Sequence, residues 1–305
     1  MHLNRALRFV TISVTIIAVG LGRSSIAQTP SLSGSPMLEC SGLPCVEVTV
    51  AGGTHLKMLV DTGNPNSLLD LAKATELGIE LKPLLGPDGK PYPRLSTGTI
   101  KGVTLGGVDL GDMEVLVANL QPGIQKGKHP EGDGSLSYTA FDGRVLKMDY
   151  KAQRISVSEV LKADIPCPGS CGTLSTPTFG KEGPPILATT GFQLNGKPVT
   201  MQIDTLYGGT MLIYPTSVEK LGLTAEQQSP KTRLFAYTDG GVDMIEGIAK
   251  TEGFDTDVLK KDAPLYFATP KVHLPDGLFD GTVGHELFTG RTVTMDFHAH
   301  HFWII

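Results

Sequence analysis

Residues 141–150 read FDGRVLKMDY, and residues 288–297 read FTGRTVTMDF. At a constant offset of 147 positions the two segments share Phe, Gly, Arg, Met and Asp, and both end in an aromatic residue. An Asp-Gly pair precedes each segment at the same offset, at Asp133-Gly134 and Asp280-Gly281. Self-similarity of this kind within one chain indicates a duplicated structural unit.

The repeat continues upstream at an offset of 143. Residues 58–62 read MLVDT, residues 201–205 read MQIDT, and each is followed by an apolar run that ends in Leu-Gly. Because order and spacing are both preserved, we interpret the chain as a tandem duplication. Lobe one covers residues 38–160 and lobe two residues 174–305, and a Cys/Pro/Gly-rich linker over 161–173 joins them.

Short alternating segments bounded by turn residues predict that each lobe consists mainly of strands. The turn signals are Gly52-Gly53 in lobe one and Asn195-Gly196 in lobe two, the latter a strong hairpin signal. The expected strands are residues 46–50, 57–60, 191–194 and 199–203. One short helix is expected in each lobe, over Ser67–Leu77 and over Thr216–Leu221. The predicted fold class is therefore all-β, with two lobes and short helices.

The composition excludes several classes of protein. The chain has 37 Gly in 305 residues, about 12% against a usual ~7%, which favours a turn-rich β protein. Without the first 27 residues it has 23 Lys+Arg and 31 Asp+Glu, a net charge of 23 − 31 = −8. An acidic chain of this kind is not expected to bind nucleic acid. The apolar content is high enough to argue against disorder.

Residues 1–27 have the features of a cleavable export signal. Arg5 and Arg8 precede an apolar stretch over Val10–Leu21, which is too short to span a bilayer. Ser25-Ile26-Ala27 then provides small residues for cleavage before Gln28. We expect a periplasmic or secreted protein without stable membrane insertion. An uncleaved anchor is the alternative.

The four cysteines form two close pairs, Cys40 with Cys45 and Cys167 with Cys171. An even number in an exported protein favours disulfides, and the short loops favour these two local pairings among three possible connectivities. A zinc site made of the same four thiols is the alternative, but the spacing within each pair is not that of the usual zinc motifs.

Each copy places a carboxylate at the end of an apolar strand and follows it with Thr, as LVDTG over 59–63 and as QIDTL over 202–206. Two lobes related by a pseudo-twofold axis would bring Asp61 and Asp204 together. Two such carboxylates cannot both ionise easily, so they share one proton. One could then act as general base on a water while the other donates a proton to a substrate carbonyl. Gly63 would let backbone N–H groups approach the carboxylates, and the hydroxyls of the two threonines could interlock across the lobes.

With these motifs the sequence resembles the aspartic proteases of the pepsin and retropepsin group, in particular bacterial two-lobed single-chain forms. The resemblance covers both lobes and implies a two-lobed β-barrel architecture with endopeptidase activity. It implies Asp61 and Asp204 as catalytic residues. The supporting residues that it implies are Thr62, Gly63, Thr205 and Gly284.

The chain departs from the family pattern at two positions. Leu206 stands where the second motif has Gly, and the turn that follows it is one residue longer. Ser137 stands where the late Gly of lobe one is expected, whereas lobe two has Val283-Gly284 there. The hairpins that cover the substrate in this family have only positional candidates, Tyr92–Val103 and Leu234–Gly247.

Other chemistry has weaker support. His298, His300 and His301 invite a metal site, but in register they match a polar hairpin connection at residues 151–154, so a solvated turn is favoured. His285 and Glu286 follow the late Gly, and packing or surface is the favoured role for both. The chain has no Gly-x-Ser-x-Gly elbow, phosphate-binding loop, His-Glu-x-x-His helix or dinucleotide fingerprint. We therefore expect no metal and no cofactor.

Three functions remain open at this point. The first is an exported aspartic endopeptidase that acts on peptide or protein substrates and is expected to be a monomer. The second is a catalytically silent protein of the same fold that binds peptides or protein partners, which Leu206 favours. The third is a purely structural β protein, which requires the two carboxylates to lie far apart.

Overall fold

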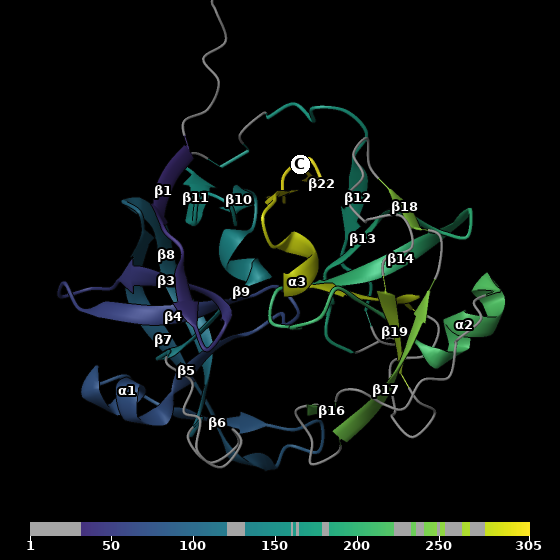
Figure 1. Ribbon diagram of the computed structural model, residues 1–305. Coiled ribbons are helices and arrows are strands. Elements are labelled where there is room, and N and C mark those ends of the chain that lie inside the picture. The colour runs from purple at the N-terminus through teal and green to yellow at the C-terminus, as the bar shows by residue number, and fades with distance from the viewer. Residues whose placement is uncertain are drawn as a thin grey trace, which may run out of the picture.

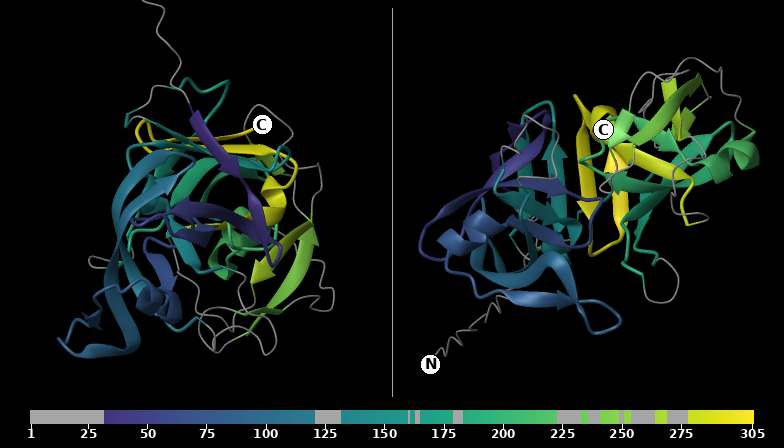
Figure 2. Two further views of the ribbon diagram at one scale, coloured as in Figure 1. Left: turned by 90° about the vertical axis from the view of Figure 1, so that its left-hand side faces the viewer. Right: turned by 90° about the horizontal axis from the view of Figure 1, so that it is seen from below.

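The structure is a computed structural model. It describes residues 32–120, 132–159, 161–162, 165–178, 183–222, 233–235, 241–248, 251–253, 264–268 and 278–305. The expected export signal lies outside these residues. Strands dominate and helices are short, so the prediction of an all-β protein is confirmed. Figures 1 and 2 show two lobes, the first in purple to teal and the second in green to yellow.

Lobe one is a sheet whose strands follow the order β2-β3-β4-β9-β5-β8-β7-β6. An additional pairing of β3 with β7 folds this sheet toward closure. The strands are β2 (Leu38–Cys40), β3 (Leu43–Thr49), β4 (His55–Asp61), β5 (Ser67–Asp70), β6 (Lys82–Leu85), β7 (Pro91–Leu105), β8 (Val108–Ala118) and β9 (Gly134–Ser137). Its helices are α1 (Leu71–Glu76) and a 3₁₀ turn, η1 (Tyr138–Phe141).

Lobe two repeats this arrangement. As β4 runs parallel to β9 in lobe one, β14 runs parallel to β20 in lobe two. The strands are β13 (Ala188–Leu194), β14 (Lys197–Asp204), β15 (Met211–Ile213), β16 (Arg233–Phe235), β17 (Gly241–Ile248), β18 (Thr251–Gly253), β19 (Pro264–Ala268) and β20 (Gly281–Gly284). Its helices are α2 (Pro215–Leu221) and α3 (His285–Phe288).

A sheet with the order β1-β11-β10-β21-β22-β12 joins the lobes. Its strands are β1 (Leu32–Pro36), β10 (Val145–Asp149), β11 (Arg154–Ser158), β12 (Gly172–Ser175), β21 (Thr292–Asp296) and β22 (His301–Ile304). Where β10 meets β21, Lys147 lies opposite Thr294, its own equivalent in the repeat. The register is symmetric about this pair, so the pseudo-twofold axis of the duplication passes through it.

β1 and β12 begin before residues 38 and 174, at which the lobes were expected to start. β1 pairs with β11 and β12 pairs with β22, so each strand completes the hairpin of its own lobe. The partner strand of β1 lies about 120 residues later in the sequence, as in the pairing of Gly34 with Ser156. Local patterns do not reveal pairings over such separations.

The turn predictions are confirmed. Asn195 and Gly196 have φ values of 50° and 74° and connect β13 to β14. Positive φ at both central residues is the requirement of a type I′ hairpin turn, which Asn-Gly meets with little strain. Gly52 and Gly53, with φ values of 87° and 78°, connect β3 to β4 in lobe one.

The prediction of a helix over Ser67–Leu77 is only partly right. The first four residues form β5, which runs parallel to β8 and antiparallel to β9. The helix begins after Asp70, whose carboxylate accepts the N–H of Ala72 and caps the first turn. Gly78, with a φ of 65°, follows its end. Pairing on both sides of β5 overrode the helical spacing of its leucines. In lobe two, α2 agrees with the expected Thr216–Leu221. None of the described helices is long and apolar enough to cross a bilayer.

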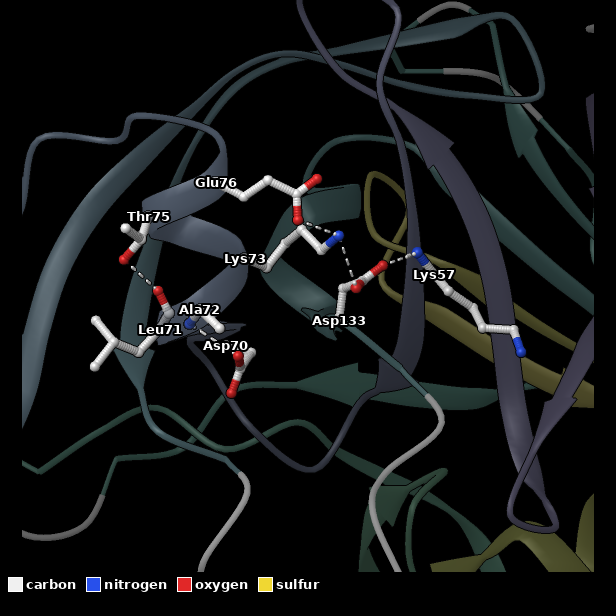
Figure 3. A network of polar contacts seen from close by, with 8 residues as sticks. All are labelled: Lys57, Asp70, Leu71, Ala72, Lys73, Thr75, Glu76 and Asp133. Carbon is white, nitrogen blue, oxygen red and sulfur yellow. Dashed lines mark hydrogen bonds and ion pairs between the residues drawn. The ribbon is translucent and has the colours of Figure 1, made fainter.

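The repeated Asp-Gly pairs anchor the strand next to each predicted catalytic strand. In Figure 3 the carboxylate of Asp133 lies between the backbone amide of Lys57, at 2.8 Å, and the ammonium of Lys73, at 3.6 Å. Asp280 holds the equivalent position in lobe two. It accepts hydrogen bonds from Thr200 N–H, Ser217 Oγ and Lys220 Nζ at 3.0, 2.9 and 2.8 Å.

These contacts predict that Asp280 stabilises lobe two. Burial acts to raise the pKa of Asp280, but Lys220 and the hydrogen bonds from Thr200 and Ser217 outweigh burial and lower the pKa below its usual value. Asp280→Asn should reduce the free energy of unfolding at pH 7 by about 1–3 kcal/mol. The loss should shrink as the pH falls through the lowered pKa, because the wild-type carboxyl is then protonated.

Denaturant unfolding between pH 2 and pH 7 measures this difference. Asp88→Asn is the matched control, since Asp88 pairs with Lys90 at an exposed position. Equal changes in the two variants would contradict the anchoring role of Asp280.

Candidate active site

The two predicted catalytic carboxylates stand at the ends of equivalent strands, Asp61 on β4 and Asp204 on β14. Side chains alternate between the two faces of a strand, so Val60 and Ile203 point into the two cores and the aspartates point away from them. The side chain of Asp61 is buried, with its residue only 2% exposed.

The two threonines that follow the aspartates interlock across the lobes, as predicted. The N–H of Thr62 donates to Thr205 Oγ1, and the N–H of Thr205 donates to Thr62 Oγ1, both at 3.1 Å. Each hydroxyl also donates to the strand of the other lobe, Thr62 Oγ1 to the Ile203 carbonyl and Thr205 Oγ1 to the Val60 carbonyl. Both residues are 0% exposed. The bonds on the two sides are equivalent under the repeat, so the local symmetry is the same as that of the sheet joining the lobes.

Gly63 brings the two carboxylates together. Its N–H donates to Asp61 Oδ1 at 3.1 Å. Its Cα faces the carboxylate of Asp204 so closely that an added Cβ would overlap it, lying 2.7 Å from each oxygen. Glycine is therefore required here for space, as the sequence led us to expect. The distant carboxylates that a purely structural protein requires are not observed.

This environment perturbs both acids. Burial and the nearby charge of Asp204 raise the pKa of Asp61 to about 7, against the opposing effect of backbone hydrogen bonds from Gly63 and Asn64. Burial also raises the pKa of Asp204, although the N–H groups of Leu206 and Tyr207 oppose it. Asp61 Oδ2 is buried without a hydrogen-bond partner among the described residues. The pair therefore holds a proton at pH values at which an isolated carboxyl would have lost it.

Leu206 keeps the backbone contact of the glycine that it replaces. Its N–H donates to Asp204 Oδ1 at 2.9 Å, as the N–H of Gly63 donates to Asp61, and Tyr207 N–H adds a second bond at 3.0 Å. Six residues, 205–210, separate β14 from β15, whereas five, 62–66, separate β4 from β5. The lengthened second turn predicted from the sequence is thus present, and it retains the hydrogen bond to the carboxylate.

The late elements lie beside the catalytic strands, with Ser137 opposite Asp61 and Gly284 opposite Asp204. A Cβ on Gly284 would overlap the carbonyl of Tyr207 in the longer turn, so only glycine fits. Ser137 has room, and its hydroxyl bonds with Ser67 and Thr139 at 3.1 and 2.6 Å. The exchange of Gly for Ser in lobe one therefore leaves the strand intact.

The cysteines form the two local disulfides that we favoured, Cys40–Cys45 and Cys167–Cys171. The first closes the hairpin of β2 and β3. With all four thiols in disulfides, the alternative of a zinc site is wrong.

The histidines do not gather at the carboxylates. His298 and His300 lie in the exposed turn between β21 and β22, as the repeat predicted, and His301 begins β22. In the part of the chain that the structure describes, no three His, Cys, Asp or Glu residues are placed to hold a metal. His285 packs edge-on against Tyr150 with ring centroids 5.4 Å apart, so its role is packing, as favoured.

The two segments proposed to cover the substrate lie in equivalent hairpins of the two lobes, β6–β7 in lobe one and β16–β17 in lobe two. Tyr92–Val103 lies within β7, which pairs with β6, and Leu234–Gly247 falls on β16, β17 and the residues between them, which lie outside the described part. In Figure 1 β6, β16 and β17 lie low in the view, on one side of the molecule.

Sequence analysis missed Gln202, Tyr214 and Thr282, which form a cluster next to Asp204. The hydroxyls of Tyr214 and Thr282 donate to Gln202 Oε1 at 3.1 and 3.2 Å, and Gln202 Nε2 donates to the Gly63 carbonyl of lobe one at 3.3 Å. The one available signal was that Gln202 stands where the first copy has Leu59.

The crossed threonine bonds predict a measurable loss of stability. Thr62→Val keeps the side-chain shape but leaves the Ile203 carbonyl and the Thr205 N–H without partners, which should cost about 1–3 kcal/mol. Thr205→Val should behave alike, and the double variant should lose less than the sum of the two. Thermal unfolding checks this, with Thr75→Val on the exposed side of α1 as control. Additive losses would contradict a shared network.

The raised pKa of Asp61 predicts that replacing this residue stabilises the protein, whereas the threonine variants are expected to lose stability. The folded protein binds a proton here up to about pH 7, whereas the unfolded chain releases it near 3.8. Wild-type stability therefore falls as the pH rises between these values. Asp61→Asn lacks this titration and should match the wild type near pH 3 but exceed it by about 2–4 kcal/mol at pH 8. The free energies of unfolding of Asp61→Asn and wild type at both pH values test this prediction. A variant less stable than wild type at pH 8 would contradict the raised pKa of Asp61.

Residues 46–140 match the family model described as aspartyl protease. No curated protein matches the chain in sequence. Among solved structures, the chain is similar to basic 7S globulin from soybean and to conglutin gamma, a basic 7S globulin from lupine seeds. Each has 11% identity and a TM-score of 0.44, over 90% of this chain and 95% of the other. The family match contains Asp61 and most of its lobe, so residues 46–140 are similar in sequence to an aspartyl protease domain.

Proposed function

We propose that the chain is an exported aspartic endopeptidase, which hydrolyses peptide bonds with a water molecule activated between Asp61 and Asp204. The observation that carries this proposal is the pairing of two carboxylates at the ends of equivalent strands. Crossed hydrogen bonds between Thr62 and Thr205 hold the pair. A family match over lobe one supports the same reaction class.

In the proposed reaction, the ionised carboxylate takes a proton from the water as its oxygen attacks the carbonyl carbon of the scissile bond. The other carboxyl gives its proton to the carbonyl oxygen. The resulting tetrahedral species then breaks the bond between carbon and nitrogen. The departing amine takes up a proton from the pair, and one hydroxyl of the tetrahedral species returns a proton to the pair as the new carbonyl group forms. Neither carboxylate forms a covalent bond with the substrate, and the site ends with one shared proton, as it began.

The proposed location is the periplasm or the outside of the cell. Both disulfides suit an oxidising compartment. The expected export signal over residues 1–27 supports the same location. Peptides or unfolded proteins are the proposed substrates, and the protein is proposed to act as a monomer without metal, cofactor or nucleic acid.

A second function has one specific observation in its favour. Leu206 occupies the position of the second motif glycine, and a leucine side chain beside Asp204 could block a substrate carbonyl while leaving peptide binding intact. On this alternative the protein is a catalytically silent binding module. The hydrogen bond from Leu206 N–H to Asp204 favours the enzyme, because the backbone contact of the glycine is retained.

Cleavage of an unfolded protein substrate between pH 3 and pH 8 tests the two functions. Wild-type activity should fall as the pH rises through about 7, where the shared proton is lost from the pair that includes Asp61. Asp61→Asn and Asp204→Asn should each lower the rate by at least about 100-fold, the usual scale for removing a general acid or base. Asp88→Asn, on an exposed turn, should not change it.

Leu206→Gly separates the alternatives. If the wild type cleaves, this variant should stay within a few-fold of it. If a folded wild type fails to cleave at every pH and Leu206→Gly cleaves, Leu206 has silenced the site and the binding module is favoured. Failure of both would remove the endopeptidase proposal.

A further inference from the structure

The surface that carries the carboxylates is chemically unequal in the two lobes. On β4 the partly exposed Leu59 shares one face with the buried Asp61, and on β14 Gln202 and Asp204, both partly exposed, share the equivalent face. Leu59 and Gln202 are equivalent in the repeat. Beside the aspartates, therefore, the first lobe presents an aliphatic side chain and the second an amide.

The amide of Gln202 has a defined orientation. Its oxygen accepts from the hydroxyls of Tyr214 and Thr282. Its nitrogen faces the carbonyl of Gly63 in the other lobe, at 3.3 Å. A carbonyl can only accept, so a flipped amide would set two acceptors against each other. The two hydroxyls also contact each other at 2.7 Å, so they share two protons between this contact and the amide oxygen. One of the two N–H groups of Nε2 has no partner among the described residues.

The corresponding wall of lobe one has no such donor. On β9, next to Leu59, stands Ser135, and Thr282 is its counterpart next to Gln202 on β20. Ser135 is 3% exposed, and its hydroxyl lacks a hydrogen-bond partner among the described residues, whereas that of Thr282 bonds to both Gln202 and Tyr214. The polar cluster of lobe two is therefore not a general property of the duplicated unit.

A substrate meets both walls. An extended peptide points successive side chains in opposite directions, so the two residues that flank the scissile bond face different lobes. We infer that Gln202 determines specificity: its free N–H selects, on the lobe-two side of the scissile bond, an uncharged side chain with a hydrogen-bond acceptor (Asn, Gln, Ser or Thr), while Leu59 selects an apolar side chain on the other. A carboxylate is disfavoured next to Gln202 because Asp204 lies on the same face. This inference rests on the proposed endopeptidase function.

A peptide-library digest by the full chain, read by mass spectrometry, tests the inference. Wild type should enrich uncharged acceptor residues at one flank of the cleaved bond and apolar residues at the other. Gln202→Met keeps the length of the side chain but removes the donor. It should lower kcat/KM for acceptor-containing peptides about three- to tenfold, the scale of one neutral hydrogen bond, and leave all-apolar peptides within twofold.

Exchanging the two residues sharpens the test. In the double variant Leu59→Gln with Gln202→Met, the new amide lies next to the unpaired Ser135 hydroxyl, and the acceptor preference should move to the opposite flank of the scissile bond. Gln193→Met, an identical change at an exposed position of β13, should leave the wild-type profile unchanged. Thermal unfolding of each variant confirms that it is folded, and Gln202→Met alone decides if the double variant does not fold.

The possible failures differ. If wild type cleaves and Gln202→Met keeps the same two-sided preference, the inference is overturned and the endopeptidase stands. If folded Gln202→Met loses cleavage of every peptide, Gln202 acts on catalysis through Gly63 and not on selection, which also overturns the inference. If wild type cleaves nothing, the proposed function falls and the inference falls with it.

Discussion

The exchange of hydrogen bonds between Thr62 and Thr205 is the constraint on which the rest of the site depends. Each threonine hydroxyl accepts the backbone N–H of the other threonine and donates to a strand carbonyl of the other lobe, all without contact with water. Because an unpaired buried polar group is costly, neither lobe can shift without breaking several of these bonds. The hydrogen bonds of Thr62 and Thr205, which do not titrate, therefore fix the separation of the two aspartates.

A second symmetric contact supports the first. The sheet that joins the lobes pairs Lys147 with Thr294 on the pseudo-twofold axis, and its register is symmetric on both sides of that pair. The strands of this sheet and the strands that end in the aspartates are far apart in sequence, but the same pseudo-twofold axis relates both sets. A duplicated chain can thus keep one geometry along this axis although neighbouring residues differ between its two halves, and several such differences lie near Asp204. There Leu206 replaces glycine, the turn is longer, and Gln202 replaces an aliphatic residue.

Much of this arrangement could be predicted from the sequence because it is local or repeated. The Asn195-Gly196 hairpin follows from the positive φ values that this dipeptide accepts, and the short loops between the cysteines favoured the two observed disulfides. The repeat also predicted that Asp61 and Asp204 meet, since two equivalent turns in two related lobes can face each other across one axis. Residues 67–70 show the limit of such patterns, because strand pairing on both sides overrode a helical spacing.

The sequence by itself determined the duplication, the all-β class, the hairpin turns and the identity of the paired acids. Each of these depends on particular residue types that follow one another at short or regular spacing. Only the tertiary structure decided that β1 joins a strand about 120 residues later, that burial and Asp204 raise the pKa of Asp61, and that Gln202 reaches the carbonyl of Gly63. These properties depend on which atoms lie next to one another after folding. Desolvation, charge proximity and cross-lobe hydrogen bonds arise between segments whose separation in the sequence carries no information about their distance in space.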